Sequence, residues 1–119
     1  MMGNEILNRA LLLLGYSDSQ GNISAEQRIK SRALSVLNAV YADLFYTVHE
    51  DGFVPLVSLS DPIQLPEKML FDIMPYGVAS FLAMSESDGD NQQVFTVLYN
   101  QKRAGINQKT MISDVLPTV

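Results

Sequence analysis

The pattern of apolar and polar positions predicts a short helix near the start of the chain and a long helix after it. The short helix begins at Asn4, a good N-cap, and ends at Gly15, a residue that suits a helix C-terminus. The long helix opens with a capping box at Ser24 and Gln27. Its apolar stripe keeps a period of 3.6 residues over roughly six turns: Ile29, Ala33, Val36, Leu37, Val40, Tyr41, Leu44 and Val48. The opposite, solvent side carries Arg28, Lys30, Arg32, Ser35, Asn38 and Asp43.

Two further helices follow from the same reasoning. A third is predicted to begin at Pro66 and to run up to the polar turn at 85–91, and because Pro75 cannot complete a helical ladder, this helix should kink there or break and restart. Its small residues would let another helix approach closely: Gly77, Ala79, Ser80 and Ala83. A fourth helix follows the polar turn at 85–91 and ends at Gly105.

The remaining stretches lack a helical period. Residues 49–65 combine prolines with apolar residues that suit extended chain, so we predict a loop with one or two short strands. Residues 107–119 are predicted to form an extended tail. Since neither a repeat nor a linker divides the rest, the sequence predicts an all-α protein: a four-helix domain over residues 1–106 with a long second helix, and a tail over residues 107–119.

The composition is that of an ordinary globular chain. Hydrophobic residues make up 47% and charged residues 18%. No stretch reaches the roughly 18 apolar residues of a membrane span, and the first residues lack the features of a signal peptide. The absence of cysteine excludes disulfides, thiolate zinc sites and cysteine nucleophiles. A net charge of −5 without clustered Lys and Arg argues against tight nucleic-acid binding.

Candidate chemistry is sparse. A general base or metal site would have to be built around His49-Glu50-Asp51, but neither a second histidine at helical spacing nor a thiolate accompanies it. We therefore interpret His49 as a residue at a helix C-terminus. The run Asp88 to Gln92 resembles the start of a calcium loop but lacks the later bidentate glutamate, which favours an N-capping turn for the fourth helix. The sequence predicts no enzyme, no cofactor and no metal.

Apolar residues outside the predicted helices indicate contacts with other subunits. Four helices cannot cover all of this apolar material, so we predict a protein interface there. Its residues are Phe53, Val54, Leu56 and Val57 in the loop, and Met111, Ile112, Val115 and Leu116 in the tail.

Three packing motifs follow one another over roughly residues 5–105. They are Ala10–Tyr16 at the end of the first helix, Arg32–Leu34 with Leu37-Asn38 and Tyr41–Leu44 in the long helix, and Met74–Ala83 followed by Tyr99–Arg103. In this order and spacing, the motifs resemble the head–tail connector, or adaptor, proteins of tailed bacteriophages and prophages. The tail matches no motif of that family.

The resemblance implies a structural subunit without catalysis. Members of the family form a ring beneath the portal and seal or extend the channel through which DNA passes. The implied partners are the portal protein, tail proteins and further copies of the chain, in a twelve-fold ring if it follows the portal. Many such proteins are monomers until the portal templates them. The implied location is the virion neck, after assembly in the host cytoplasm.

The acidic composition is compatible with such a channel. A negatively charged lumen repels the DNA backbone, so the genome would pass without specific binding. Candidate lining carboxylates are Asp61, Asp72 and Glu86.

Two other classes of function stay open at this point. A small prophage or bacterial regulatory or scaffold protein would act as a helical dimer, with the long second helix as its seam. An enzyme would use His49 together with Glu50 or Asp51.

Overall fold

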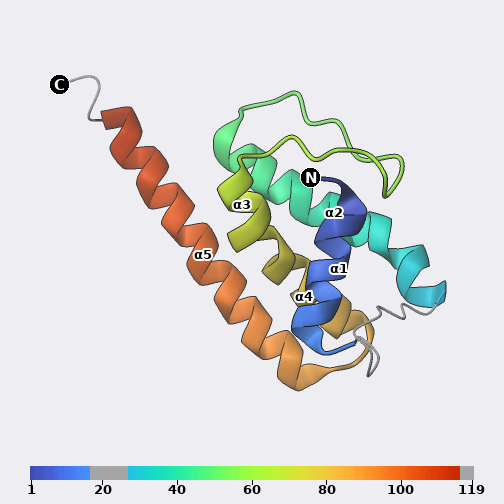
Figure 1. Ribbon diagram of the computed structural model, residues 1–119. Helices are drawn as coiled ribbons and strands as arrows, with labels where there is room; N and C mark the ends of the chain where they lie inside the picture. The colour runs from blue at the N-terminus through green and yellow to red at the C-terminus, as the bar shows by residue number, and fades with distance from the viewer. Residues whose placement is uncertain (17–26, 116–119) are drawn as a thin grey trace.

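The computed structural model describes residues 1–16 and 27–115, with the backbone alone for residues 27–30 and 107–115 (Figure 1). Within these ranges the chain forms five α-helices: α1 (Gly3–Leu14), α2 (Gln27–Val48), α3 (Glu67–Asp72), α4 (Met74–Ser85) and α5 (Gly89–Val115). The predicted short strands do not occur in the described ranges, where the only β-interaction is an isolated antiparallel bridge between Met2 and Pro62. The predicted all-α class is confirmed. None of the described helices is long and apolar enough to cross a membrane.

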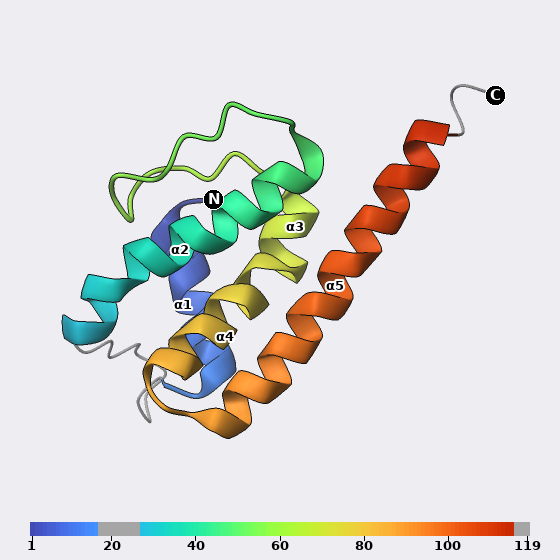
Figure 2. The same ribbon diagram turned by 180° about the vertical axis from the view of Figure 1, so that it is seen from behind.

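Helix α4 lies at the centre and packs against all four other helices (Figures 1 and 2). Eight of its twelve residues are buried, because it is apolar or small on nearly every side and such a helix needs neighbours all round. Gly77 permits the closest approach: a Cβ atom there would lie 2.7 Å from Tyr99 Cε1 and 2.9 Å from Val40 Cγ1. The predicted role of small residues in close helix packing is confirmed at this position.

The predicted third helix is in fact two helices. Helix α3 ends at Asp72 and α4 begins at Met74, with Ile73 as a turn between them. Pro75 in the first turn of α4 has no amide to continue the hydrogen-bond ladder of α3, whereas an unpaired first-turn position tolerates it. Of the two outcomes expected at Pro75, break and restart is the correct one, and the fold has five helices instead of four.

Helix α1 begins at Gly3, slightly before the predicted start after Asn4, because the loop supplies acceptors for its first amides. The Gly3 amide donates to the Asp61 carbonyl at 3.2 Å, and the Asn4 amide donates to the Leu59 carbonyl at 2.8 Å. The helix ends as predicted at Gly15, whose φ of 77° is in the left-handed region.

Most of the described apolar stripe of α2 is buried against the rest of the subunit, whereas Val48 at its end is 39% exposed. Ala33, Leu37 and Val40 are inaccessible to solvent, and further along the helix so is Leu44. The capping box predicted at Ser24 lies outside the described residues.

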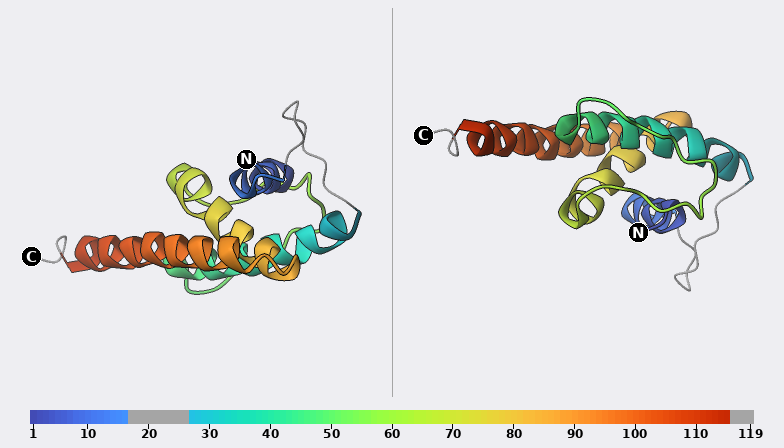
Figure 3. Two further views of the ribbon diagram at one scale, coloured as in Figure 1. Left: turned by 90° about the horizontal axis from the view of Figure 1, so that it is seen from below. Right: turned by 90° about the horizontal axis from the view of Figure 1, so that it is seen from above.

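Helix α5 runs to Val115, well past the predicted stop at Gly105. Gly105 keeps a negative φ, and one glycine costs a helix only about 1 kcal/mol. Extending an existing helix costs much less than starting one, so α5 continues. The extended tail is therefore wrong for residues 107–115, which are helical, while 116–119 lie outside the described part. The end of α5 projects beyond the other helices in every view (Figures 1, 2 and 3).

Candidate interaction surfaces

The loop between α2 and α3 is held in one shape by two side chains. The Asn38 side chain on α2 accepts a hydrogen bond from the Leu56 amide at 2.7 Å and donates a hydrogen bond to the Leu56 carbonyl at 3.0 Å. The Asp61 carboxylate accepts the amides of Val57 at 2.8 Å and Ser58 at 2.9 Å. The loop is therefore a fixed feature of the surface even though it contains no strand.

Because of these hydrogen bonds, which we call the Asn38 clamp and the Asp61 clamp, the four loop residues predicted to form an interface differ in their exposure to solvent. Val54 and Val57 are 73% and 83% exposed, and we call this pair the loop surface. Phe53 is half-buried, with its ring edge-on to Tyr41 at a centroid distance of 5.1 Å. Leu56 is buried in the core, contrary to its expected place on an exposed surface, because the Asn38 clamp turns this stretch of the loop onto α2.

The tail residues of the predicted interface lie on or beyond α5. Positions 111, 112 and 115 belong to the projecting end of the helix, and Leu116 lies outside the described residues. Their role in an interface stays a prediction.

A cluster of polar side chains ties α5 to α2 before α5 leaves the body. The Arg103 guanidinium donates two hydrogen bonds to the Asp43 carboxylate, at 2.7 and 2.9 Å, and the Tyr99 hydroxyl donates to the same carboxylate at 2.6 Å. Burial raises the pKa of Tyr99 and the Asp43 carboxylate raises it further, while the same carboxylate raises the pKa of Arg103. The sequence pattern placed Asp43 on the solvent side of α2, but it faces α5.

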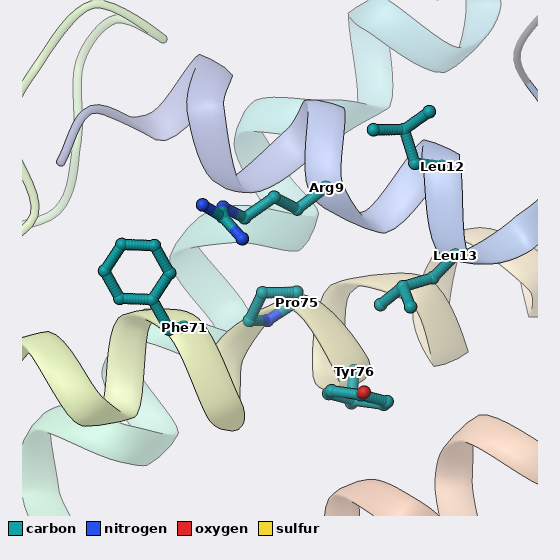
Figure 4. Close-up of a pocket in the computed structure, with 6 residues that line it drawn as sticks. All are labelled: Arg9, Leu12, Leu13, Phe71, Pro75 and Tyr76. Atoms are coloured by element: carbon teal, nitrogen blue, oxygen red, sulfur yellow. The ribbon is translucent and has the colours of Figure 1, made fainter. Parts of the chain in front are cut away.

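A groove lies between α1 and the α3–α4 corner (Figure 4). Its volume is about 310 Å³, and we call it the α1–α4 groove. It is lined by Arg9, Leu12 and Leu13 of α1, Phe71 of α3, and Pro75 and Tyr76 of α4. Arg9 and Phe71 lie at one end and Leu13 and Tyr76 toward the other. The α1–α4 groove is thus lined mainly by apolar side chains, together with the cationic side chain of Arg9.

Cations lie over two of the aromatic rings in this region. The Arg9 guanidinium carbon is 4.3 Å from the Phe71 ring centroid, and the Lys102 ammonium of α5 is 4.6 Å from the Tyr76 ring centroid. Such cation–π contacts hold the positive charges in place next to the apolar lining. Among residues whose side chains are described, no carboxylate forms an ion pair with Arg9.

Sequence reasoning missed the groove, although a signal was present. In the run of four leucines at the end of α1, Leu11 and Leu14 complete the buried stripe. Leu12 and Leu13 fall off that stripe and are 52% and 39% exposed. Two leucines that the core does not need were the sign of a second apolar surface.

His49 follows the last residue of α2 and is exposed, as predicted for a residue at a helix C-terminus. Its ring lies against Phe45 at a centroid distance of 4.4 Å. Within the described part of the chain, no three His, Cys, Asp or Glu side chains are close enough to hold a metal ion. The expectations of no enzyme, cofactor or metal stay predictions.

Asp88 forms the N-capping turn predicted for the last helix. Its carboxylate accepts the Asn91 amide at 3.4 Å, the Asn91 side chain at 2.7 Å and the Tyr16 hydroxyl at 3.0 Å. The hydrogen bonds from Asn91 and Tyr16 lower the pKa of Asp88. Burial, with a further effect from Asp88, raises the pKa of Tyr16 to about 12. The turn therefore also fastens the end of α1 to the start of α5.

Comparisons of the chain with protein-family models, with curated proteins and with solved structures find no match. The loop surface, the α1–α4 groove and the projecting end of α5 are the features from which a function has to be argued.

Proposed function

We propose that this chain is a head–tail connector subunit of a tailed bacteriophage or prophage, which joins the portal to the tail in a ring that lets DNA pass. The observation that carries the proposal is the loop surface. Val54 and Val57 are the two most exposed large apolar side chains of the described residues, and Asn38 and Asp61 fix the loop that presents them. A preformed apolar projection loses little conformational entropy on docking, which favours a protein partner.

The three motifs that resemble the connector family support the proposal because they pack together. The motif Ala10–Tyr16 includes the end of α1, and the motif Met74–Ala83 makes up most of the central helix α4. Tyr99–Arg103 is the segment of α5 that binds Asp43. Motifs far apart in sequence thus belong to one packing unit, as expected if they specify one fold.

The charge of the chain fits passage of DNA without specific binding. The net charge is −5, and Asp72 is an exposed carboxylate on α3, whereas Asp61 is engaged by loop amides. We propose the portal protein and tail proteins as partners, a ring that follows the symmetry of the portal, and the virion neck as the location.

The regulatory dimer is less well supported. It would use the long second helix as its seam, and the apolar side chains Ala33, Leu37 and Val40 of that helix are already buried within the subunit. No described feature favours the dimer over the connector.

The test is co-expression with the portal protein encoded near this chain in the same genome, followed by pull-down and cryo-electron microscopy. We expect a ring stacked on the portal. The double variant Val54→Asp/Val57→Asp should weaken the association by roughly a hundredfold, because charged groups replace buried apolar contacts.

The matched control is Val94→Asp/Val97→Asp, which changes two valines of α5 that are 52% and 50% exposed. It should bind the portal like the unmodified chain. If both double variants lost the same amount of portal association, the loop surface would not be part of the interface. A stable dimer that does not associate with the portal would overturn the connector proposal.

A further inference from the structure

We propose that the α1–α4 groove holds the C-terminal end of α5, residues 107–115, from a second copy of this chain. The inference rests on the proposed function, because it names the contact through which neighbouring ring subunits would join. It is carried by the open groove, by the projecting helix, and by the match between their charges and apolar residues.

The groove requires an occupant of a particular chemistry. Leu12, Leu13 and Phe71 expose apolar surface along it, and the Arg9 guanidinium lies over Phe71 at one end. The groove therefore fits an apolar helix face that also carries a carboxylate. A single exposed apolar side chain does not indicate a partner. A groove of about 310 Å³ lined by several apolar side chains is a typical binding site.

The end of α5 has that chemistry. The last described side chain of α5 that packs on the core is Ile106, and the helix continues to Val115. At about 100° per residue, positions 111 and 115 lie about 40° apart around the helix, and position 114 lies about 60° from 111. The residues there are Met111, Asp114 and Val115, and Ile112 lies about 60° from position 115 but about 160° from position 114, at the other edge of the apolar face. The segment thus combines an apolar face with an acidic residue at its edge, which complements Arg9.

The occupant has to come from another copy. Helix α5 is continuous from Gly89 to Val115, and Arg103 fixes it to α2 before the projecting end begins. In Figures 1 and 2 this end points away from α1. It cannot turn back into its own groove without breaking the helix. A helix end of one copy in the groove of the next is a head-to-tail contact, which closes into a ring when the rotation between copies allows it.

Thiol crosslinking tests the contact directly, because the chain contains no cysteine. The variant Leu13→Cys/Ile112→Cys places one thiol in the groove and one near the end of α5. A short bis-maleimide should then join different copies into a ladder of covalent multimers, both at high protein concentration and in the portal complex. The control Ser60→Cys/Ile112→Cys, with its first thiol on the exposed loop, should give at least tenfold less multimer.

Charge exchange supplies a second, independent readout. Arg9→Glu and Asp114→Arg should each reduce the crosslinking of the Leu13→Cys/Ile112→Cys variant roughly tenfold, and the two together should restore it. Arg9 is exposed, so Arg9→Glu should keep the fold, and circular dichroism checks the fold of every variant. No multimers in either setting, or equal multimers from the control pair, would overturn the proposal.

The outcomes also separate this proposal from the connector function. Crosslinks without portal binding would establish the contact between copies and overturn the connector function. A ring on the portal without crosslinks would support the connector function and overturn the proposed contact between copies. If the portal protected the groove thiol from maleimide while no multimers formed, the occupant would be the portal, and the proposed contact between copies would be wrong.

Discussion

The Asp43 carboxylate on α2 accepts two hydrogen bonds from the Arg103 guanidinium on α5, at 2.7 and 2.9 Å. Tyr99, one turn earlier on α5, donates its hydroxyl to the same carboxylate at 2.6 Å. The pairing geometry of a guanidinium and a carboxylate is specific, so these bonds attach α5 to α2 in a defined way, in addition to the packing of α5 on α4.

Replacement of Asp43 should cost more stability than replacement of Arg103. Asp43→Ala removes the acceptor of the mostly buried Tyr99 hydroxyl, and we expect a loss of about 1–3 kcal/mol in the free energy of unfolding. Arg103→Ala breaks only a partly exposed ion pair and should cost less than about 1 kcal/mol. Urea denaturation measures both. Equal losses would mean that the Tyr99 bond contributes nothing.

Addition of a methyl group at Gly77 should destabilise the protein. The new Cβ of Gly77→Ala would meet Tyr99 and Val40 at less than 3 Å, so α5 and α2 would have to move, at about 1–3 kcal/mol. The control is Gly105→Ala, whose Cβ meets nothing within 4 Å in a continuous helix. It should stabilise the protein by up to about 1 kcal/mol. Thermal unfolding should thus shift in opposite directions, and a stabilising Gly77→Ala would contradict the packing described.

Loss of the Asn38 side chain should release the loop surface. Asn38→Ala leaves the amide and carbonyl of buried Leu56 without partners, which should cost about 1–3 kcal/mol. Amide hydrogen exchange of residues 56–58 should accelerate, while Asn100→Ala on the exposed side of α5 should leave it unchanged. If the loop keeps its protection in Asn38→Ala, this clamp does not hold it.

Stability should fall at high pH because of Tyr16 and Tyr99. The pKa of Tyr16 rises from 10.0 to about 12 in the folded chain, and the pKa of Tyr99 rises as well. A folded-state pKa above the unfolded value gives stability that is complete below pH 10 and lost as the pH rises toward 12 and beyond.

Chemical denaturation between pH 8 and pH 12 measures this loss. Tyr16→Phe and Tyr99→Phe should each flatten the decline, because neither variant has the corresponding proton to lose on unfolding. A decline of the same steepness in both variants and in the unmodified chain would assign it to other groups.

Several elements could be predicted from the sequence because their causes are local. The stripes of α1 and α2, the stop at Gly15, the break at Pro75 and the cap at Asp88 each depend on residues within a turn or two of one another. A helical period of 3.6 residues determines which side chains share a face, and a proline or glycine acts on its own backbone.

The surfaces on which function would depend could not be predicted in the same way. The sequence pattern predicts that Asn38 and Asp43 of α2 face the solvent. In the structure, Asn38 binds the loop 18 residues away and Asp43 binds α5 60 residues away. Leu56 reads as a free loop residue and is buried.

The sequence by itself determined the helical class, several helix boundaries and the absence of thiol chemistry, since these follow from local periodicity and composition. The tertiary structure alone decided that Leu12 and Leu13 line a groove with Phe71, that Val54 and Val57 stand exposed, and that α5 continues past Gly105. The reason is physical: periodicity fixes which residues share a face, whereas the neighbour opposite that face depends on how distant segments pack.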